Sequence, residues 1–179
     1  NLRSRRFNQA RAKKEKNLSF LRLWVSVLNR SLEHRARLHP GISTTMSESV
    51  TAKIEGPTGW IEFSSPKANA MSSAMLTELA AKIGGLSADP QVRVIVLQSG
   101  GEGAFCAGAS FDELKSITEQ AQAEQFFLGF GKVILAIKES PKFVVARVQG
   151  KAVGGGVGLV AACDYSIGLS AAAFRLSEL

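Results

Sequence analysis

The chain has 179 residues, 45% of them hydrophobic, which is enough for one domain with a buried core and excludes a disordered composition. Its net charge of +7 would suggest nucleic-acid binding, but the net positive charge is confined to residues 1–45. These residues contain eleven Lys and Arg against two acidic residues, a net of +9, so residues 46–179 carry −2. Both histidines, His34 and His39, lie in residues 1–45, which excludes a histidine-based triad or histidine metal site from residues 46–179.

Residues 1–45 form a basic leader. Apolar residues recur in it at steps of three and four, which predicts an amphipathic helix that contains Leu18, Leu21, Val25, Leu28 and Leu32. We prefer the interpretation that the leader precedes the true start at Met46 and has no folded role. The alternatives are a transit peptide, which would direct the protein to the mitochondrial matrix, and a functional basic arm. Without a transit peptide we expect a cytoplasmic protein, and no apolar run approaches the roughly 18 to 20 residues of a membrane-spanning helix.

Residues 50–55 and 60–64 alternate apolar and polar side chains, which predicts a β-hairpin with one buried face. The four residues 56–59, with the sequence Gly-Pro-Thr-Gly, are its predicted connection. A helix is then expected over residues 72–83, ended by Gly84 and Gly85. Its apolar side consists of Met75, Leu76, Leu79, Ala80 and Ile83.

Residues 92–97 are a short apolar run typical of a buried strand, and the loop after it, residues 100–109, is rich in small residues. Ser110 or Asp112 is suited to cap a helix that starts near Glu113, and we expect this helix to continue to about Glu139. We interpret its apolar side as core rather than as an acyl pocket, and it consists of Phe126, Phe127, Phe130, Ile134 and Ile137.

A second buried strand is expected over Phe143–Val148, before a helix start over residues 159–163. The loop between them holds a glycine cluster, Gly150, Gly154, Gly155, Gly156 and Gly158. Glycine loses the most backbone entropy on folding, so the cluster indicates either a close approach of the main chain to another group or N–H groups that point outward at a helix N-terminus. Tight packing without a ligand is the alternative. Since small-residue loops follow two successive buried strands, we predict an α/β fold in which both loops meet on one side of a sheet.

The glycines do not match the common phosphate-binding motifs. In G-x-G-x-x-G, Gly154 and Gly156 would require a third glycine where the chain has Leu159, and no Gly-Lys-Ser/Thr stands where a P-loop needs it. The only cysteines, Cys106 and Cys163, are too few for a disulfide framework or a metal knuckle, which favours a reducing compartment.

Five segments carry a resemblance to a known family, namely residues 67–71 (KANAM), 105–109 (FCAGA), 141–146 (PKFVVA), 150–156 (GKAVGGG) and 162–164 (ACD). Their content and order resemble the enoyl-CoA hydratase/isomerase (crotonase) superfamily over residues 50–179, with no counterpart for residues 1–45. The resemblance implies a spiral of ββα units. Residues 46–179 would be the N-terminal part of this domain, truncated before its C-terminal helical part, and the complete protein would form trimers or hexamers.

The resemblance also implies a site. An acyl-CoA thioester carbonyl would lie between two backbone N–H groups, those of Ala109 and Gly155, which stabilise the enolate formed during proton transfer. Contacts to the coenzyme A portion would come from Lys67, Ala68, Ala70, Ala107 and Gly108. Coenzyme A is then part of the substrate, so we expect no separate cofactor, no metal and no nucleic-acid partner.

Proton transfer is expected to depend on Glu178. Family hydratases commonly use two glutamates, but the first of these positions is Gly158 here and only the second is retained. A double-bond shift needs one base, so we favour an isomerase over a hydratase of fatty-acid or amino-acid degradation. The further alternatives are that Glu178 is an ordinary surface residue and that the protein is a non-catalytic CoA-binding or scaffold homologue.

Three polar or thiol residues near the motifs have expected structural roles. Ser110 stands where many family members carry aspartate, and this leaves a backbone donor at Ala109 intact. We expect Asp164 to accept hydrogen bonds from nearby backbone donors and Cys163 to be a small packing residue.

Overall fold

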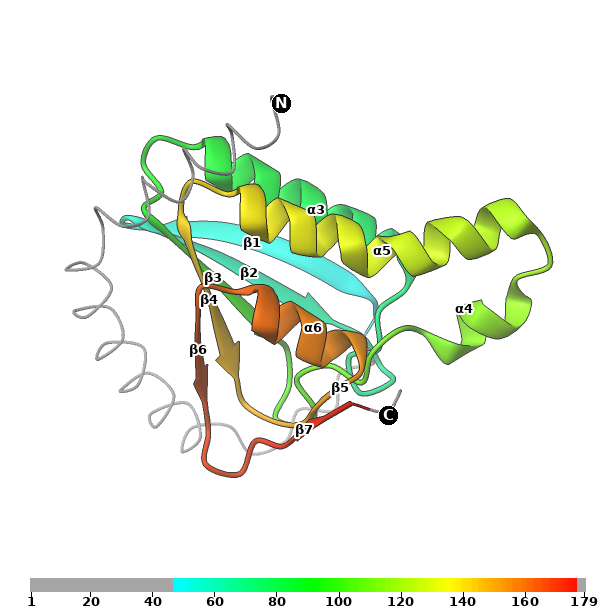
Figure 1. Cartoon of the computed structure of the whole chain (residues 1–179). Helices are drawn as coiled ribbons and strands as arrows, with labels where there is room; N and C mark the ends of the chain where they lie inside the picture. Colours follow the sequence, from blue (N-terminus) through cyan, green and yellow to red (C-terminus); the bar gives the residue numbers. More distant parts are fainter. Residues whose placement is uncertain (1–46, 177–179) are drawn as a thin grey trace.

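The computed structural model describes residues 47–176, so the amphipathic helix predicted in the leader and Glu178 both lie outside the described residues (Figure 1). β1 (Ser49–Glu55) and β2 (Thr58–Ser64) form the predicted hairpin, but the four-residue connection was wrong. Glu55 pairs with Thr58, which leaves Gly56 and Pro57 as a two-residue turn. Gly56 has a φ of +57° and Pro holds φ near −65°, a combination that suits a tight type II′ turn.

The main sheet has the strand order β1-β2-β3-β4-β6, in which only β1 is antiparallel to its neighbour. β3 (Val94–Ser99) and β4 (Phe143–Val148) are buried at every residue, as expected for strands covered on both faces. β4 has its predicted bounds. β3 begins and ends two residues later than predicted, because the pairing with β2 and β4 extends the ladder over the buried polar residues Gln98 and Ser99.

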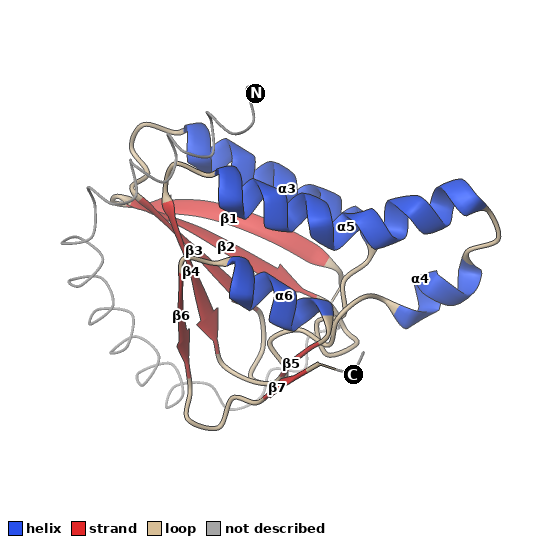
Figure 2. Cartoon of the chain, viewed as in Figure 1, coloured by secondary structure: helices blue, strands red, loops and turns tan. Residues whose placement is uncertain are grey.

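Three helices cover one face of this sheet (Figure 2): α3 (Ser73–Ala88), α5 (Gln120–Glu139) and α6 (Gly155–Ala162). The main core lies between sheet and helices and includes Ile61, Phe63, Ile95, Leu97, Leu76, Leu79, Ile137 and Leu159. A smaller apolar cluster lies on the other face and consists of Val94, Val96, Phe143, Val145 and Ile167.

α3 does not end at Gly84 and Gly85, contrary to prediction. Both glycines lie on the exposed side of the helix, where an added Cβ would meet nothing within 4 Å. The next residue, Leu86, is buried and packs onto Gly59 of β2. This packing extends the helix to Ala88, because burial of one leucine outweighs the weak helix propensity of two glycines.

The single helix predicted up to Glu139 was also wrong, because α4 (Phe111–Ser116) and α5 are separate helices. Ser110 caps α4 by accepting a hydrogen bond from the Glu113 N–H at 3.4 Å. Of the two candidates, Ser110 is therefore the cap, and Asp112 lies within the helix. Phe127 was assigned to the core but is 69% exposed. The buried side of α5 is Phe126, Gly129, Val133 and Ile137, a 3–4 spacing that excludes Phe127.

A second, two-stranded sheet pairs β5 (Ala152–Val153) with β7 (Phe174–Arg175) in parallel, while β6 (Tyr165–Gly168) completes the main sheet. Isolated parallel bridges join Cys106 to Ala152 and Met71 to Ala109. The chain thus repeats one pattern, a main-sheet strand, a short extended segment and a helix, which is the predicted spiral of ββα units. No helix in the described part of the chain is long and apolar enough to cross a membrane.

Candidate active site

The two small-residue loops after β3 and β4 contact each other through their backbones, as predicted. The Val153 N–H donates to the Cys106 carbonyl at 2.9 Å, and the Cys106 N–H donates to the Lys151 carbonyl at 3.3 Å. A Cβ added to Gly150 would overlap the Gly103 carbonyl oxygen, so this glycine is required by the approach of two main chains. Figure 1 shows β5, the start of α6 and the chain that leads into α4 gathered at this end of the sheet.

Each loop places a glycine with positive φ directly before a predicted donor. Gly108 has a φ of +92° and precedes Ala109, and Gly154 has a φ of +51° and precedes Gly155. L residues rarely adopt this conformation, which sets the direction of the peptide group that follows. A Cβ on Gly108 would lie 3.8 Å from the Gly155 nitrogen, so the two turns are immediate neighbours.

The backbone N–H groups of Ala109 and Gly155 have no acceptor among the described residues. The Met71–Ala109 bridge uses the Gly108 carbonyl and the Ser110 N–H, which leaves the Ala109 N–H outside the ladder. Gly155 is the first residue of α6, where an N–H has no intrahelical acceptor. The positive end of the α6 dipole lies at the same place, so the arrangement suits a negatively charged oxygen.

Helix α6 begins four residues before its predicted start, inside the glycine triplet, and the triplet is tightly packed. A Cβ on Gly155 would lie 2.6–2.8 Å from the ring of Phe130, and one on Gly156 would lie 2.7 Å from the Cys106 carbonyl oxygen. Close packing therefore accounts for both glycines sterically. It coexists with a Gly155 N–H that has no acceptor among the described residues, so the two interpretations of the cluster are compatible.

The buried thiol of Cys106 lies beside these turns. Its Sγ accepts a hydrogen bond from the Gly108 N–H at 3.4 Å. Burial raises the pKa of the thiol to about 11, against a smaller lowering by the Gly108 hydrogen bond. The thiol is therefore neutral at physiological pH, which makes it a packing and hydrogen-bonding group rather than a nucleophile.

The residues predicted to contact coenzyme A are brought together from two loops. Lys67, Ala68 and Ala70 lie in the turn after β2, and the Ala107 N–H donates to the Ala68 carbonyl at 3.1 Å. Gly108 follows and is buried, whereas Lys67 and Ala68 are exposed. The ammonium of Lys67 forms an ion pair with Asp112 of α4, a partner that the sequence did not indicate.

Asn69 is the residue in this turn whose role sequence reasoning missed. It is 3% exposed although Lys67 and Ala68 before it are exposed, and its side chain makes three hydrogen bonds to the backbone. Ala68 and Asn69 both have positive φ, at +52° and +57°. The available signal was the residue type, since asparagine tolerates this conformation better than most L residues.

The carboxylate positions are only partly described. Gly158 is half-buried on α6, and a Cβ there would meet only the Ile134 side chain at 3.8 Å, an ordinary contact that leaves room for a side chain. Glu178 lies outside the described residues. Asp164 accepts a hydrogen bond from the Val144 N–H at 2.8 Å, which confirms its predicted structural role, and Cys163 is buried as predicted.

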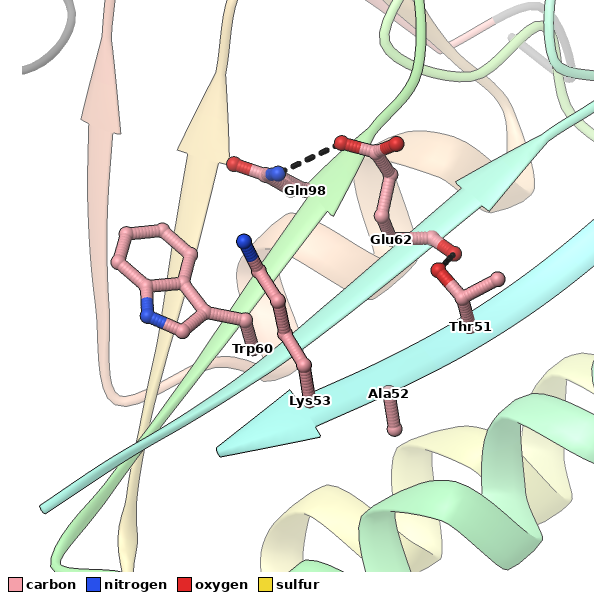
Figure 3. Close-up of a pocket in the computed structure, with 6 residues that line it drawn as sticks. All are labelled: Thr51, Ala52, Lys53, Trp60, Glu62 and Gln98. Carbon is pink, nitrogen blue, oxygen red and sulfur yellow. Dashed lines mark hydrogen bonds between the residues drawn. The ribbon is translucent and has the colours of Figure 1, made fainter. Parts of the chain in front are cut away.

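A separate pocket is present on the main sheet, and none of the predicted site residues lines it (Figure 3). Its lining comes from β1, β2 and β3 and consists of Thr51, Ala52, Lys53, Trp60, Glu62 and Gln98. Gln98 donates to the Glu62 carboxylate at 2.7 Å and accepts from Arg147 at 3.3 Å. Gln98 is thus hydrogen-bonded through both its amide nitrogen and its amide oxygen, and this side-chain pocket differs in character from the backbone site at the loop ends.

Comparisons with known proteins give the family. A sequence model described as enoyl-CoA hydratase/isomerase matches residues 54–179. (E)-Benzylidenesuccinyl-CoA hydratase of Thauera aromatica is 34% identical over 134 residues, which cover 73% of this chain and 50% of that protein. Short-chain-enoyl-CoA hydratase of Clostridium acetobutylicum is 33% identical over 131 residues, with coverage of 73% and 50%.

A crystal structure of an enoyl-CoA hydratase/isomerase (crotonase) from Legionella pneumophila superposes with a TM-score of 0.66 at 34% identity. The match covers 71% of this chain and 50% of that one, so the chain spans about half the length of the relatives it matches. With its repeated ββα pattern, its two contacting glycine turns and these matches, the chain belongs to the enoyl-CoA hydratase/isomerase family and has the crotonase fold.

Proposed function

We propose that the protein acts on acyl-CoA thioesters and stabilises a thioester enolate with the backbone N–H groups of Ala109 and Gly155. The observation that carries the proposal is that both groups follow glycines with positive φ, lie on contacting loops and have no acceptor in the described part of the chain. Fixed donors of this kind are already oriented toward the developing charge. Each typically contributes about 3 kcal/mol to transition-state stabilisation.

In this proposal the coenzyme A portion lies along the turn after β2. Lys67 supplies a cation for its phosphate groups, and Ala68, Ala70, Ala107 and Gly108 supply backbone contacts and small side chains that allow close approach. Support comes from the hydrogen bond between the Ala107 N–H and the Ala68 carbonyl, which joins the two loops that contain these residues. Coenzyme A enters as part of the substrate, so the reaction requires no separate cofactor.

Glu178 is the proposed proton carrier, and isomerisation of a double bond is the reaction we favour. A single carboxylate can remove a proton from one carbon and return it to another, whereas hydration ordinarily uses two carboxylates, and Gly158 has none. Hydration is the second candidate, because the relatives compared above carry hydratase names. A CoA-binding protein without catalysis is the third.

The test compares 3-enoyl-CoA and 2-enoyl-CoA as substrates of the complete gene product, with CoA binding measured by calorimetry. We expect isomerisation to exceed hydration. Glu178→Gln should lower the rate by about 10²-fold or more, because the amide cannot carry the proton, while CoA affinity stays unchanged.

Each other outcome has a definite meaning. Faster hydration than isomerisation would favour the hydratase alternative, and CoA binding without turnover would favour the binding protein. Unchanged activity in Glu178→Gln would remove this residue from the mechanism. Failure to bind CoA or acyl-CoA would refute the proposal as a whole.

Assembly and compartment are part of the same proposal. We propose a homotrimer or a dimer of trimers for the complete protein, which size-exclusion chromatography with light scattering tests directly. The proposed compartment is the cytoplasm, or the mitochondrial matrix if residues 1–45 act as a transit peptide. Fusion of these residues to a fluorescent protein distinguishes the two.

A further inference from the structure

Asn69 joins three backbone segments through one buried side chain. Its Oδ1 accepts a hydrogen bond from the Ser65 N–H at 2.9 Å, directly after β2. Its Nδ2 donates to the Gly100 carbonyl at 3.0 Å and to the Ala104 carbonyl at 2.8 Å, both in the loop after β3. Both amide hydrogens and the amide oxygen are therefore used, and the side chain is 3% exposed.

The same turn contains backbone strain. Ala68 has a φ of +52°, a conformation that L residues other than asparagine and aspartate seldom adopt, and Asn69 follows at +57°. Such strain persists only where the surroundings over-determine the conformation, and it concentrates at functional sites. The three hydrogen bonds of Asn69 hold the backbone of the turn in this conformation, next to Ala68.

The turn over residues 65–71 is also hydrogen-bonded to residues on both sides of the proposed donor Ala109. The Met71 N–H donates to the Gly108 carbonyl at 2.9 Å, and the Ser110 N–H donates to the Met71 carbonyl at 2.8 Å. Before Ala109, the Ala107 N–H also donates to the Ala68 carbonyl at 3.1 Å. A change in the turn would thus be transmitted to Ala109 through hydrogen bonds on either side of it.

We infer that Asn69 is a positioning residue that sets the distance between the CoA-contacting turn and the N–H group of Ala109. The inference rests on the proposed function for its effect on catalysis. The link between the two loops is a separate claim, which can be tested without any ligand. Asn69 touches no reacting atom in this scheme and acts through Ala68, Ala107 and Ala109.

Two substitutions separate the hydrogen bonds from the backbone conformation. Asn69→Gly keeps a residue that adopts positive φ and removes all three side-chain hydrogen bonds, whereas Asn69→Ala also adds conformational strain. Asn69→Asp keeps the acceptor for Ser65 but turns a carboxylate toward two carbonyl oxygens. All are compared with the wild type in the complete protein, at temperatures where melting curves show each variant to be folded.

In folded Asn69→Gly we expect the dissociation constant for CoA to rise and kcat to fall, with a loss in kcat/KM of about tenfold to a hundredfold from misplacement of the site. Hydrogen–deuterium exchange should accelerate in residues 65–71 and 100–109 together. Asn69→Asp should show the same pattern more strongly. A lower melting temperature with unchanged CoA affinity, kcat and loop exchange would overturn the inference and leave a stabilising role alone.

The exchange measurement also separates this inference from the proposed function. If the wild type binds no CoA, the proposed function fails, while coupled acceleration of exchange in both loops still supports the link through Asn69. If the wild type binds CoA and turns over substrate, but exchange rises only in residues 65–71, the link itself is refuted.

Discussion

The two sides of the candidate site are held by different forces. On one side, the glycine turn over residues 150–158 lies against other backbone, with Gly150 on the Gly103 carbonyl and Gly156 on the Cys106 carbonyl. On the other, helix α4 has no buried residue. Polar contacts hold it, including the Lys67–Asp112 ion pair and a 2.8 Å hydrogen bond from the Ser73 N–H to the Glu113 carboxylate.

The two proposed roles, enolate stabilisation and CoA binding, lie on different sides of the site. The donor at Gly155 belongs to the closely packed side, and the cation at Lys67 belongs to the open, polar side. A tightly packed site tolerates almost no added side-chain volume. Exposed ion pairs contribute little to the free energy of unfolding, and salt screens them. Substitutions on the two sides should therefore differ strongly in their effect on stability.

The largest effect is expected for Gly150→Ala, because its Cβ would overlap a backbone carbonyl that no rotamer change can move. We expect the free energy of unfolding to fall by more than about 3 kcal/mol, or folding to fail. Gly131→Ala is the matched control, since a Cβ there meets nothing within 4 Å. Chemical denaturation measures both, and equal midpoints would contradict steric closure of this side.

An intermediate effect is expected for Gly155→Ala, whose Cβ would lie 2.6–2.8 Å from the Phe130 ring. A side chain can give way where a backbone cannot, so we expect a loss of about 1–3 kcal/mol. Phe130→Ala removes the obstacle, and a double-mutant cycle should show the two changes to be less costly together than their sum. Additive costs would mean that Phe130 does not restrict this position.

The smallest effect on stability is expected on the polar side. The side chains of Lys67 and Asp112 are 69% and 60% exposed, so loss of their ion pair should change the free energy of unfolding by less than about 1 kcal/mol. Asp112→Asn should nevertheless strengthen CoA binding at low salt, because it frees Lys67 for the phosphates, while Lys67→Ala should weaken it. Calorimetry at two salt concentrations measures the CoA affinity of both variants and of the wild type. Equal affinities in all three would exclude Lys67 from the CoA contact.

Several features could be predicted because local chemistry alone determines them. The bounds of β4 follow from an apolar run between Pro141 and Gly150 that only Arg147 interrupts, and the loop positions follow from their small residues. Ser110 was one of two predicted caps, and the structure selects it. By contrast, the end of α3 depends on Leu86 packing against Gly59, which no local propensity reports.

The sequence by itself determined the order of β1 to β4, of α3 and of the two small-residue loops, because apolar runs and glycine clusters act over a few neighbouring residues. Its five motifs carried the resemblance to the family. Only the tertiary structure decided what those loops rest on. Asn69 binds carbonyl groups 31 and 35 residues away, and Phe130 of α5 covers Gly155 of α6. Such contacts arise from the packing of distant segments, which is why they became visible only in the folded chain.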